Sequence, residues 1–339
     1  MYYNMKQWVA SVIDAPVKKP LPLLSFPCTQ LMGITVQELI HRADLQAKGM
    51  ALVAERVPSA AAVSLMDLSV EAEAFGSAIH YSEDEVPTVV GALVEDEDSA
   101  KALPIPEIGA GRTSIYIDAI REAQQLITDR PVFAGIIGPY SLASRLMDVS
   151  KTMIYCFDEP DMVHIILEKS TDFLIQYSQA FKDAGANGVI MAEPLTGLLS
   201  PGMAAEFSHP YVKQIIDEVQ TDDFAVFYHN CGNNVPFMIS DIYQLGASGY
   251  HFGDAISMMD VLPQAPHHVL VMGNISPSQQ FKGGTPDTIK RATAELLETC
   301  QDYSNFLLSS GCDIPPGSSW ANIDAFFAVA ESIHPRDHQ

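Results

Sequence analysis

Basic residues are scarce in this chain of 339 residues, which has 19 Lys and Arg against 42 Asp and Glu and a formal net charge of −23. A nucleic-acid-binding face needs clustered Lys and Arg, so this charge argues against a nucleic-acid partner. It also disfavours binding to an anionic membrane surface. The simplest interpretation is an acidic, solubilising surface, part of which could steer a partner protein.

Targeting and membrane-spanning segments are lacking as well. The N-terminus does not show a basic start, an apolar core and a small-residue cleavage site in succession, so no secretory signal is expected. No apolar run approaches the roughly 20 residues that cross a bilayer. We therefore expect a soluble, cytoplasmic protein.

Cysteine is sparse, and the chain has no C-x-x-C pair of the kind that often builds a structural zinc site. An odd number of cysteines in a large chain without a secretory signal favours free, metal-bound or catalytic thiols over a disulfide framework. The five cysteines are Cys28, Cys156, Cys231, Cys300 and Cys312.

No linker-like tract, low-complexity segment or fixed-period repeat divides the chain, so we expect one domain over residues 1–339. Eight short apolar runs alternate with longer segments of helical periodicity. The runs are Leu21–Phe26, Ala61–Met66, Val132–Ile137, Gly188–Ala192, Phe224–Tyr228, Ser248–Phe252, His268–Met272 and Asn305–Ser309. This alternation predicts an α/β fold with parallel strands. The count of eight, and the lack of a Gly-rich phosphate turn after the first run, favour a closed (β/α)₈ TIM barrel over an open sheet.

Amphipathic helices are expected between these strands, and an N-terminal extension precedes the first one. The helix candidates include Thr35–Glu55, Met162–Ala184, Met203–Glu218, Pro286–Cys300 and Trp320–Ser332. Residues 76–112 interrupt the alternation after the second strand with an acidic stretch rich in turn residues. We interpret them as an insertion within the domain, either a lid over the barrel or a solvated surface excursion.

In a barrel of this kind, catalytic groups lie where the strands end and the following loops begin. Polar or metal-binding residues occupy these predicted positions: Asp67, Glu193, His229-Asn230-Cys231, Asp254, Asn274 and Cys312-Asp313. Their convergence on one end of the barrel predicts the functional site there.

The pattern of His229, Cys231 and Cys312 predicts a metal site. His229 and Cys231 are two residues apart at a strand end, so their side chains project to the same side. Cys312 follows the eighth strand, which faces the fifth across the barrel. Two thiolates and one imidazole suit zinc, and three protein ligands with an open fourth position are typical of a catalytic zinc. A lone H-x-C would more often be a packed Cys beside a hydrogen-bonded His, but its coincidence with Cys312 favours the metal.

Such a zinc could exchange a substrate thiol into its open position and remove the thiol proton at neutral pH. The resulting nucleophile needs an electrophilic carbon, and a methyl group on a carrier is the simple choice. Methyl transfer requires in-line positioning and little acid–base machinery.

Five segments that span nearly the whole chain carry a family resemblance: residues 66–76, 191–201, 229–233, 272–276 and 311–319. They resemble the uroporphyrinogen decarboxylase superfamily and, within it, the zinc-dependent methylcobamide:coenzyme M methyltransferase branch. The resemblance implies a (β/α)₈ barrel with zinc ligands at His229, Cys231 and Cys312. It also implies a thiol acceptor such as coenzyme M, with a methylated corrinoid (cobalamin-type) donor carried by a partner protein. Homocysteine, tetrahydrofolate or another acceptor stays open, and Arg145 is the only Arg near a mouth position that could meet a sulfonate.

The sequence departs from the decarboxylases of this superfamily. They hold substrate carboxylates with an arginine-rich N-terminal segment, whereas residues 20–30 here contain no Arg. They also carry a histidine near the position of Cys312, although Asp67 aligns with their catalytic aspartate. A porphyrinogen-type decarboxylase is therefore the alternative function, and a non-catalytic corrinoid- or metal-binding accessory protein is the third.

Other residues at the strand ends are expected to assist. Glu193 is a catalytic candidate that could fill the fourth zinc position or take up the thiol proton, or it could be paired within the barrel rim. Asp67, the second catalytic candidate, could orient substrate or corrinoid together with Glu71, or both could cap the following helix.

Asn274 and Asp254 are candidate cofactor-binding residues, as hydrogen-bonding partners of the ligands or of the rim. His251 is expected to be packed or hydrogen-bonded inside the barrel and not to be a ligand.

Overall fold

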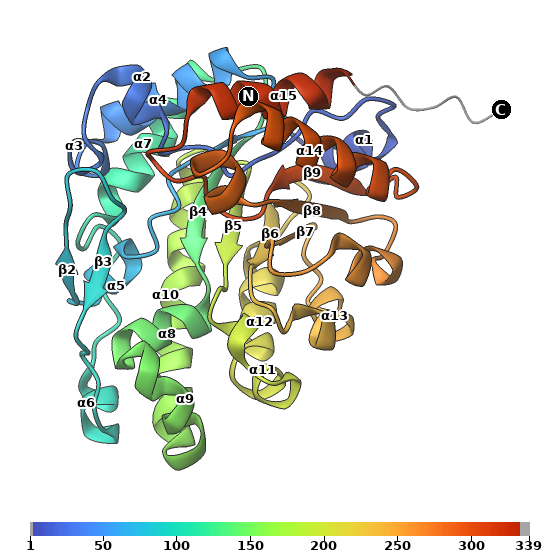
Figure 1. Ribbon diagram of the computed structural model, residues 1–339. Coiled ribbons are helices and arrows are strands. Elements are labelled where there is room, and N and C mark those ends of the chain that lie inside the picture. Colours follow the sequence, from blue (N-terminus) through green and yellow to red (C-terminus); the bar gives the residue numbers. More distant parts are fainter. Residues whose placement is uncertain (1–2, 333–339) are drawn as a thin grey trace.

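The computed structural model describes residues 3–332, in which a seven-stranded parallel sheet curls into a barrel (Figure 1). Its strands, in spatial order, are β1 (Ala62–Val63), β4 (Val132–Ile137), β5 (Gly188–Ala192), β6 (Ala225–Asn230), β7 (Gly249–Phe252), β8 (Leu270–Ile275) and β9 (Phe306–Ser310). Every neighbouring pair is parallel. All seven correspond to runs expected from the sequence, and the α/β TIM-barrel fold is confirmed.

The expected first strand, Leu21–Phe26, is extended but forms no regular ladder; we call residues 20–26 the closing segment. It lies between β9 and β1, since Leu21 N–H donates to the Leu308 carbonyl and Ala60 N–H donates to the Pro20 carbonyl, each over 2.9 Å. Pro20 and Pro22 have no N–H to donate, so regular pairing cannot develop here. The barrel is therefore closed by seven strands and one proline-interrupted segment.

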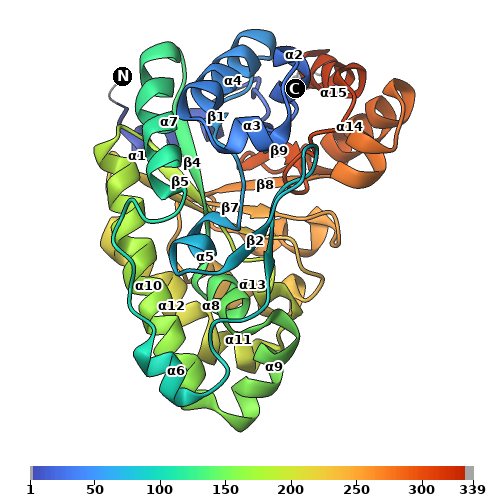
Figure 2. The ribbon, with the colours of Figure 1, turned by 90° about the vertical axis from the view of Figure 1, so that its left-hand side faces the viewer.

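Helices surround the sheet and cover its outer face (Figures 1 and 2). The longer ones are α4 (Ala43–Arg56), α7 (Thr113–Leu126), α8 (Pro139–Met147), α9 (Val149–Asp158), α10 (Pro160–Asp183), α12 (His209–Val219), α13 (Val235–Tyr243), α14 (Pro286–Cys300) and α15 (Trp320–Ser332). Short helices include α2 (Cys28–Met32), α3 (Val36–Ile40) and α11 (Pro201–Phe207), with single turns η1 (Thr196–Leu198), η2 (Met258–Asp260), η3 (Leu262–Gln264) and η4 (Pro277–Lys282) between them. Within residues 3–332, every helix is too short or too polar to cross a bilayer.

Two helices expected to be continuous are broken. The expected helix Thr35–Glu55 is split into α3 and α4 at His41 and Arg42. The expected helix Met203–Glu218 is split into α11 and α12 at Ser208, because Pro210 cannot donate the next helical hydrogen bond and instead starts a new helix.

Residues 76–112 follow α5 (Val70–Ala74) and contain the antiparallel hairpin of β2 (Ala78–His80) and β3 (Thr88–Val90), then α6 (Glu97–Ala102). Figure 2 shows them running along one side of the barrel. The segment is anchored at two places along its length. The Glu83 carbonyl accepts from Val36 N–H over 2.7 Å, and Lys169 of α10 donates to three carbonyls of α6 and its C-terminus.

The amino end of the barrel is covered by α1 (Met5–Asp14). Trp8 packs on Phe133 and Phe227, whose rings stack 4.8 Å apart inside the sheet. The N-terminal extension expected from the sequence thus closes one end of the core. The carboxyl ends of the strands, which we call the barrel mouth, carry the polar residues.

Candidate metal centre

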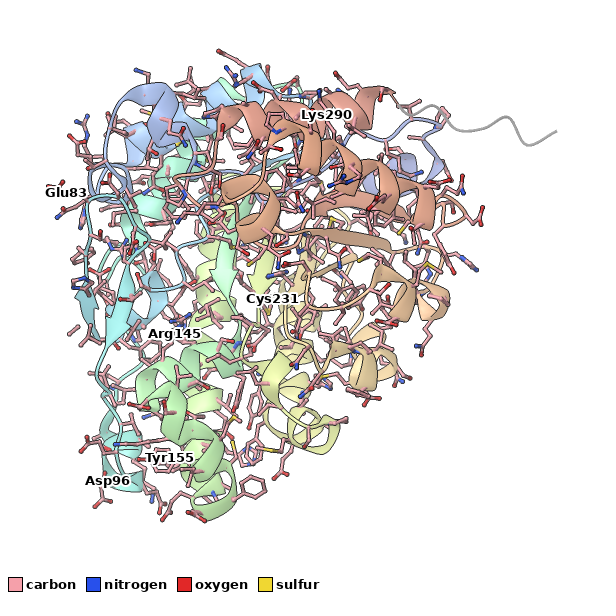
Figure 3. The ribbon with its side chains drawn as sticks, viewed as in Figure 1. Glu83, Asp96, Arg145, Tyr155, Cys231 and Lys290 are labelled. Atoms are coloured by element: carbon pink, nitrogen blue, oxygen red, sulfur yellow. The ribbon has the colours of Figure 1, made fainter. Side chains whose placement is uncertain are left out.

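Three residues at the barrel mouth form a group that could hold a metal ion. The ligand atoms of His229, Cys231 and Cys312 all lie within 4.8 Å of one another, and His229 Nε2 is 3.5 Å from Cys312 Sγ. His229 is the penultimate residue of β6, Cys231 follows that strand, and Cys312 follows β9, so the two stretches meet as the sequence predicted. Cys231 and Arg145 mark this end of the barrel in Figure 3.

The two thiols form a coupled pair. The pKa of Cys231 is lowered because the Cys312 thiol hydrogen-bonds to it, whereas the same interaction and burial raise the pKa of Cys312. A divalent cation stabilises both thiolates and would displace both protons. Half-buried sulfurs beside an imidazole are a donor set that fits zinc.

His229 is buried and is held from behind by β7. Its Nδ1 lies 2.7 Å from His251 Nδ1 and 3.2 Å from the His251 carbonyl oxygen, which leaves Nε2 facing the cysteines. His251 Nε2 lies 2.7 Å from Ser309 Oγ on β9. Burial, followed by the neighbouring His229, lowers the pKa of His251 well below its ordinary value. His251 is thus hydrogen-bonded inside the barrel and is not part of the three-residue group, as expected.

The loop that carries Cys231 packs closely on its neighbours. Asn230 Oδ1 accepts from Gly232 N–H over 3.0 Å, and a Cβ on Gly232 would overlap Gly197. A Cβ on Gly253 would lie 2.5 Å from both Cα and Cβ of Cys231. Only glycine at these positions lets the chains after β5, β6 and β7 approach each other so closely.

Asn274 on β8 and Asp254 after β7 lie beside these loops. Asn274 Nδ2 donates to the carbonyls of Gly253 and Ile256 over 2.9 and 2.8 Å, so it fixes the loop that packs on Cys231. Asp254 is exposed, and its charge partly opposes the lowering of the Cys231 pKa by Cys312. Neither residue belongs to the three-residue group within the described part of the chain.

Glu193 follows β5 and is completely buried. Its carboxylate accepts from Tyr140 N–H and Thr196 Oγ1 over 2.8 and 2.7 Å, and from Ser141. Burial raises its pKa to about 7 even though these donors oppose the shift. The structure therefore places Glu193 against the start of α8, where its carboxylate is hydrogen-bonded within the rim. It is not a member of the metal group.

Asp67 lies in a buried ion pair. Its Oδ2 is 2.5 Å from Arg112 Nη1 and 2.8 Å from Tyr116 Oη, while Oδ1 accepts from Ser69 Oγ over 2.6 Å. Arg112 also donates to Glu73 over 2.6 Å. Sequence reasoning missed Arg112, which ends the 76–112 segment and meets Asp67 only through the fold.

Glu71 on α5 and Arg145 on α8 both lie near Asp67. Glu71 Oε1 accepts from Ile137 N–H over 2.9 Å, and burial raises its pKa to about 7. Burial lowers the pKa of Arg145, and its Nε has no hydrogen-bond partner within residues 3–332. Figure 3 shows Arg145 on α8, on the side of the mouth facing β2 and β3. The cation noted in the sequence is thus at the mouth.

Comparison with known proteins gives a consistent family. The model of the family described as "Uroporphyrinogen decarboxylase (URO-D)" matches residues 24–333. The chain is 24% identical over 270 residues to "Methylcobamide:CoM methyltransferase MtbA" of Methanosarcina acetivorans, covering 78% of each chain. It is 25% identical over 294 residues to a uroporphyrinogen decarboxylase of Janthinobacterium sp., covering 81% of this chain and 79% of the relative.

Solved structures agree on the fold. A methyltransferase from Methanosarcina mazei superposes with a TM-score of 0.85 at 23% identity, covering 98% of this chain and 99% of its own. A B12-independent methionine synthase from Shewanella sp. superposes with a TM-score of 0.60 at 10% identity, covering 93% and 95%. At these identities the superpositions establish the barrel architecture.

Proposed function

Because the chain belongs to the uroporphyrinogen decarboxylase family, we propose that it is a zinc-dependent methyltransferase that moves a methyl group from a methylated corrinoid protein to a thiol. The observation that carries this proposal is the gathering of His229, Cys231 and Cys312 at the barrel mouth. The similarity to methylcobamide:CoM methyltransferases supports it.

The proposed roles of the residues follow from their contacts. His229, Cys231 and Cys312 would hold zinc, which when bound would lower the pKa of an incoming thiol enough to remove its proton at neutral pH. Asn274 would hold the Gly253 loop against Cys231. Glu193, with its pKa near 7, would be the catalytic residue that takes up the released proton.

In the reaction the carbon–sulfur bond forms as the carbon–cobalt bond breaks. The electron pair of the broken bond remains with the corrinoid, which therefore leaves the reaction reduced. Coenzyme M is one candidate acceptor, and Arg145 would supply a cation for an acceptor with an anionic group. The 76–112 segment, anchored beside α8 through the Leu93 N–H bond to the Leu146 carbonyl, would form one wall of the mouth.

The proposal is tested by zinc content together with methyl transfer. The purified chain should contain one zinc per molecule. It should also demethylate methylcobalamin in the presence of at least one thiol, which the change in corrinoid absorbance measures. Cys231→Ala and Cys312→Ala should lose both properties. Cys300→Ala, which removes a buried thiol on α14 outside the group, should keep both.

Three results would contradict the proposal. Equal zinc content in all variants would remove the metal site. Zinc retention without demethylation across a broad panel of thiols would favour a non-catalytic accessory protein. Release of CO₂ from a porphyrinogen without zinc or thiol would instead identify a decarboxylase of the kind found among the relatives.

A further inference from the structure

A line of hydrogen bonds runs through the barrel interior, away from the metal group. His229 Nδ1 meets His251 Nδ1, His251 Nε2 meets Ser309 Oγ, and Ser309 Oγ donates to the Leu21 carbonyl, each over 2.7 Å. All four residues are at most 2% exposed. The line therefore joins β6, β7, β9 and the closing segment where water cannot substitute for a missing partner.

The far end of this line determines where the protons lie. A serine hydroxyl has one proton, and Ser309 donates it to a carbonyl, which can only accept. Ser309 Oγ must then accept from His251 Nε2–H. In a neutral imidazole with its proton on Nε2, Nδ1 carries a lone pair and accepts. His229 must therefore donate from Nδ1–H, and its own lone pair is on Nε2, the nitrogen beside Cys312.

The structure assigns His251 as a positioning residue that keeps His229 in the tautomer able to bind a metal through Nε2. This inference rests on the proposed zinc site, because the tautomer matters only if His229 is a ligand. The partner of the second ring nitrogen of a metal-binding histidine fixes both the tautomer and the orientation of the ring.

The opposite arrangement of protons is disfavoured by the closing segment. If Ser309 donated to His251 Nε2, the proton of the histidine pair would move to His251 Nδ1, and His229 would be protonated on Nε2. The buried Leu21 carbonyl would then lose the hydroxyl donor from Ser309. An unsatisfied buried acceptor is costly, so the Leu21 carbonyl biases the whole line toward the metal-binding tautomer.

Substitutions at His251 separate hydrogen bonding from packing. Asn places its amide oxygen about where Nδ1 lies and can still accept from His229, whereas Leu fills the space without an acceptor. The His251 carbonyl, the second acceptor near His229 Nδ1, remains in both variants. Zinc affinity would be measured with zinc ion alone in competition with a chromophoric chelator. We expect His251→Leu to weaken binding at least about 10-fold and His251→Asn to weaken it only about threefold or less.

If His251 acted only through packing, His251→Asn would weaken zinc binding more than His251→Leu. An apolar side chain suits this fully buried position better than an amide does. Equal affinity in the two variants, or weaker binding in His251→Asn, would overturn the inference. His209→Leu is the matched control, since it also replaces a buried imidazole with Leu but lies on α12 outside the line; its affinity should equal that of the wild type. Thermal unfolding of each variant checks that it is folded.

Nitrogen NMR of the metal-free protein tests the assignment without zinc. Labelled histidines should show His229 protonated on Nδ1 and His251 protonated on Nε2. Protonation of His251 on Nδ1 would overturn the inference even if zinc binds. If the tautomers are as assigned but the wild-type protein binds no zinc, the proposed function fails while the hydrogen-bonded line stands.

Discussion

Asp67 and Arg112 lie 45 residues apart in the chain, yet their side chains form a buried ion pair 2.5 Å long, with both partners less than 5% exposed as side chains. The pair joins the loop after β1 to the end of the 76–112 segment. Tyr116 and Ser69 satisfy the remaining positions of the Asp67 carboxylate. A carboxylate held in this way is fixed in place by the fold.

Removing the cation should destabilise the protein strongly. Arg112→Met leaves the Asp67 carboxylate buried without a counter-charge, and we expect the free energy of unfolding to fall by about 3–5 kcal/mol. Arg56→Met, which breaks the half-exposed pair with Asp324, should cost about 1 kcal/mol or less. Chemical denaturation of both variants measures the difference. Similar losses would show that burial of the Asp67 pair has no energetic consequence.

Glu71 should make stability depend on pH. Burial raises its pKa from 4.5 to about 7, so between these values the folded chain holds a proton that the unfolded chain has lost. The free energy of unfolding should therefore fall as pH rises from about 4.5 to 7, by an amount on the order of 3 kcal/mol. Glu71→Gln has no proton to lose and should flatten this dependence.

Denaturant midpoints at low and high pH test the effect. The Glu71→Gln variant should match the wild type near the lower end of the window and exceed its stability above the upper end. Glu55→Gln, on the exposed face of α4, should follow the wild type throughout. A variant that keeps the full wild-type pH dependence would assign the effect to other groups, of which Glu193 is the first to examine.

The close approach of the Gly253 loop to Cys231 should matter for zinc. A Cβ in Gly253→Ala would displace the Cys231 backbone, and we expect zinc affinity to fall about 10-fold or more. Gly202→Ala is the matched control because a Cβ at that position, in the first turn of α11, meets nothing within 4 Å. Isothermal titration with zinc compares the two variants. Equal zinc affinities of Gly253→Ala and Gly202→Ala would show that the loop accommodates the added Cβ without displacing Cys231.

Zinc should also stabilise the fold, since binding to the folded state alone adds to its stability. At a free zinc concentration about 100-fold above the dissociation constant, the gain is about 2.7 kcal/mol. A strong chelator should therefore lower the melting temperature of the wild type. The same shift should appear in Cys300→Ser and should vanish in Cys231→Ser. An unchanged melting temperature in the chelated wild type would count against a bound metal.

The sequence predicted the barrel and the metal group because both depend on local patterns. The strand runs are apolar because parallel strands are buried on both faces, and the three residues of the metal group lie at or just after the ends of two of those strands. The apolar residues of the closing segment predict a regular strand. Pro20 and Pro22, however, have no N–H to donate, so regular pairing does not form there.

Other features depend on contacts between residues far apart in the sequence, which local patterns do not reveal. Arg112 lies in a turn-rich, acidic stretch, and only the folded chain shows that it meets Asp67. The sequence left two interpretations of Glu193 open, and the hydroxyl and N–H groups at the start of α8 that bind it are contributed by residues more than 50 positions away. His251 gave only the signal of a polar residue within a strand.

The loop after β9 is also tied to the closing segment, because Ile314 N–H donates to the Leu23 carbonyl over 2.9 Å. Cys312 therefore lies beside a part of the barrel wall where Pro20 and Pro22 prevent a regular ladder. A transient opening of the barrel at this place would move Cys312 Sγ away from His229 and Cys231. Retention of the proposed zinc would then depend on the barrel staying closed here, and hydrogen exchange of the Leu21 amide would report on that opening.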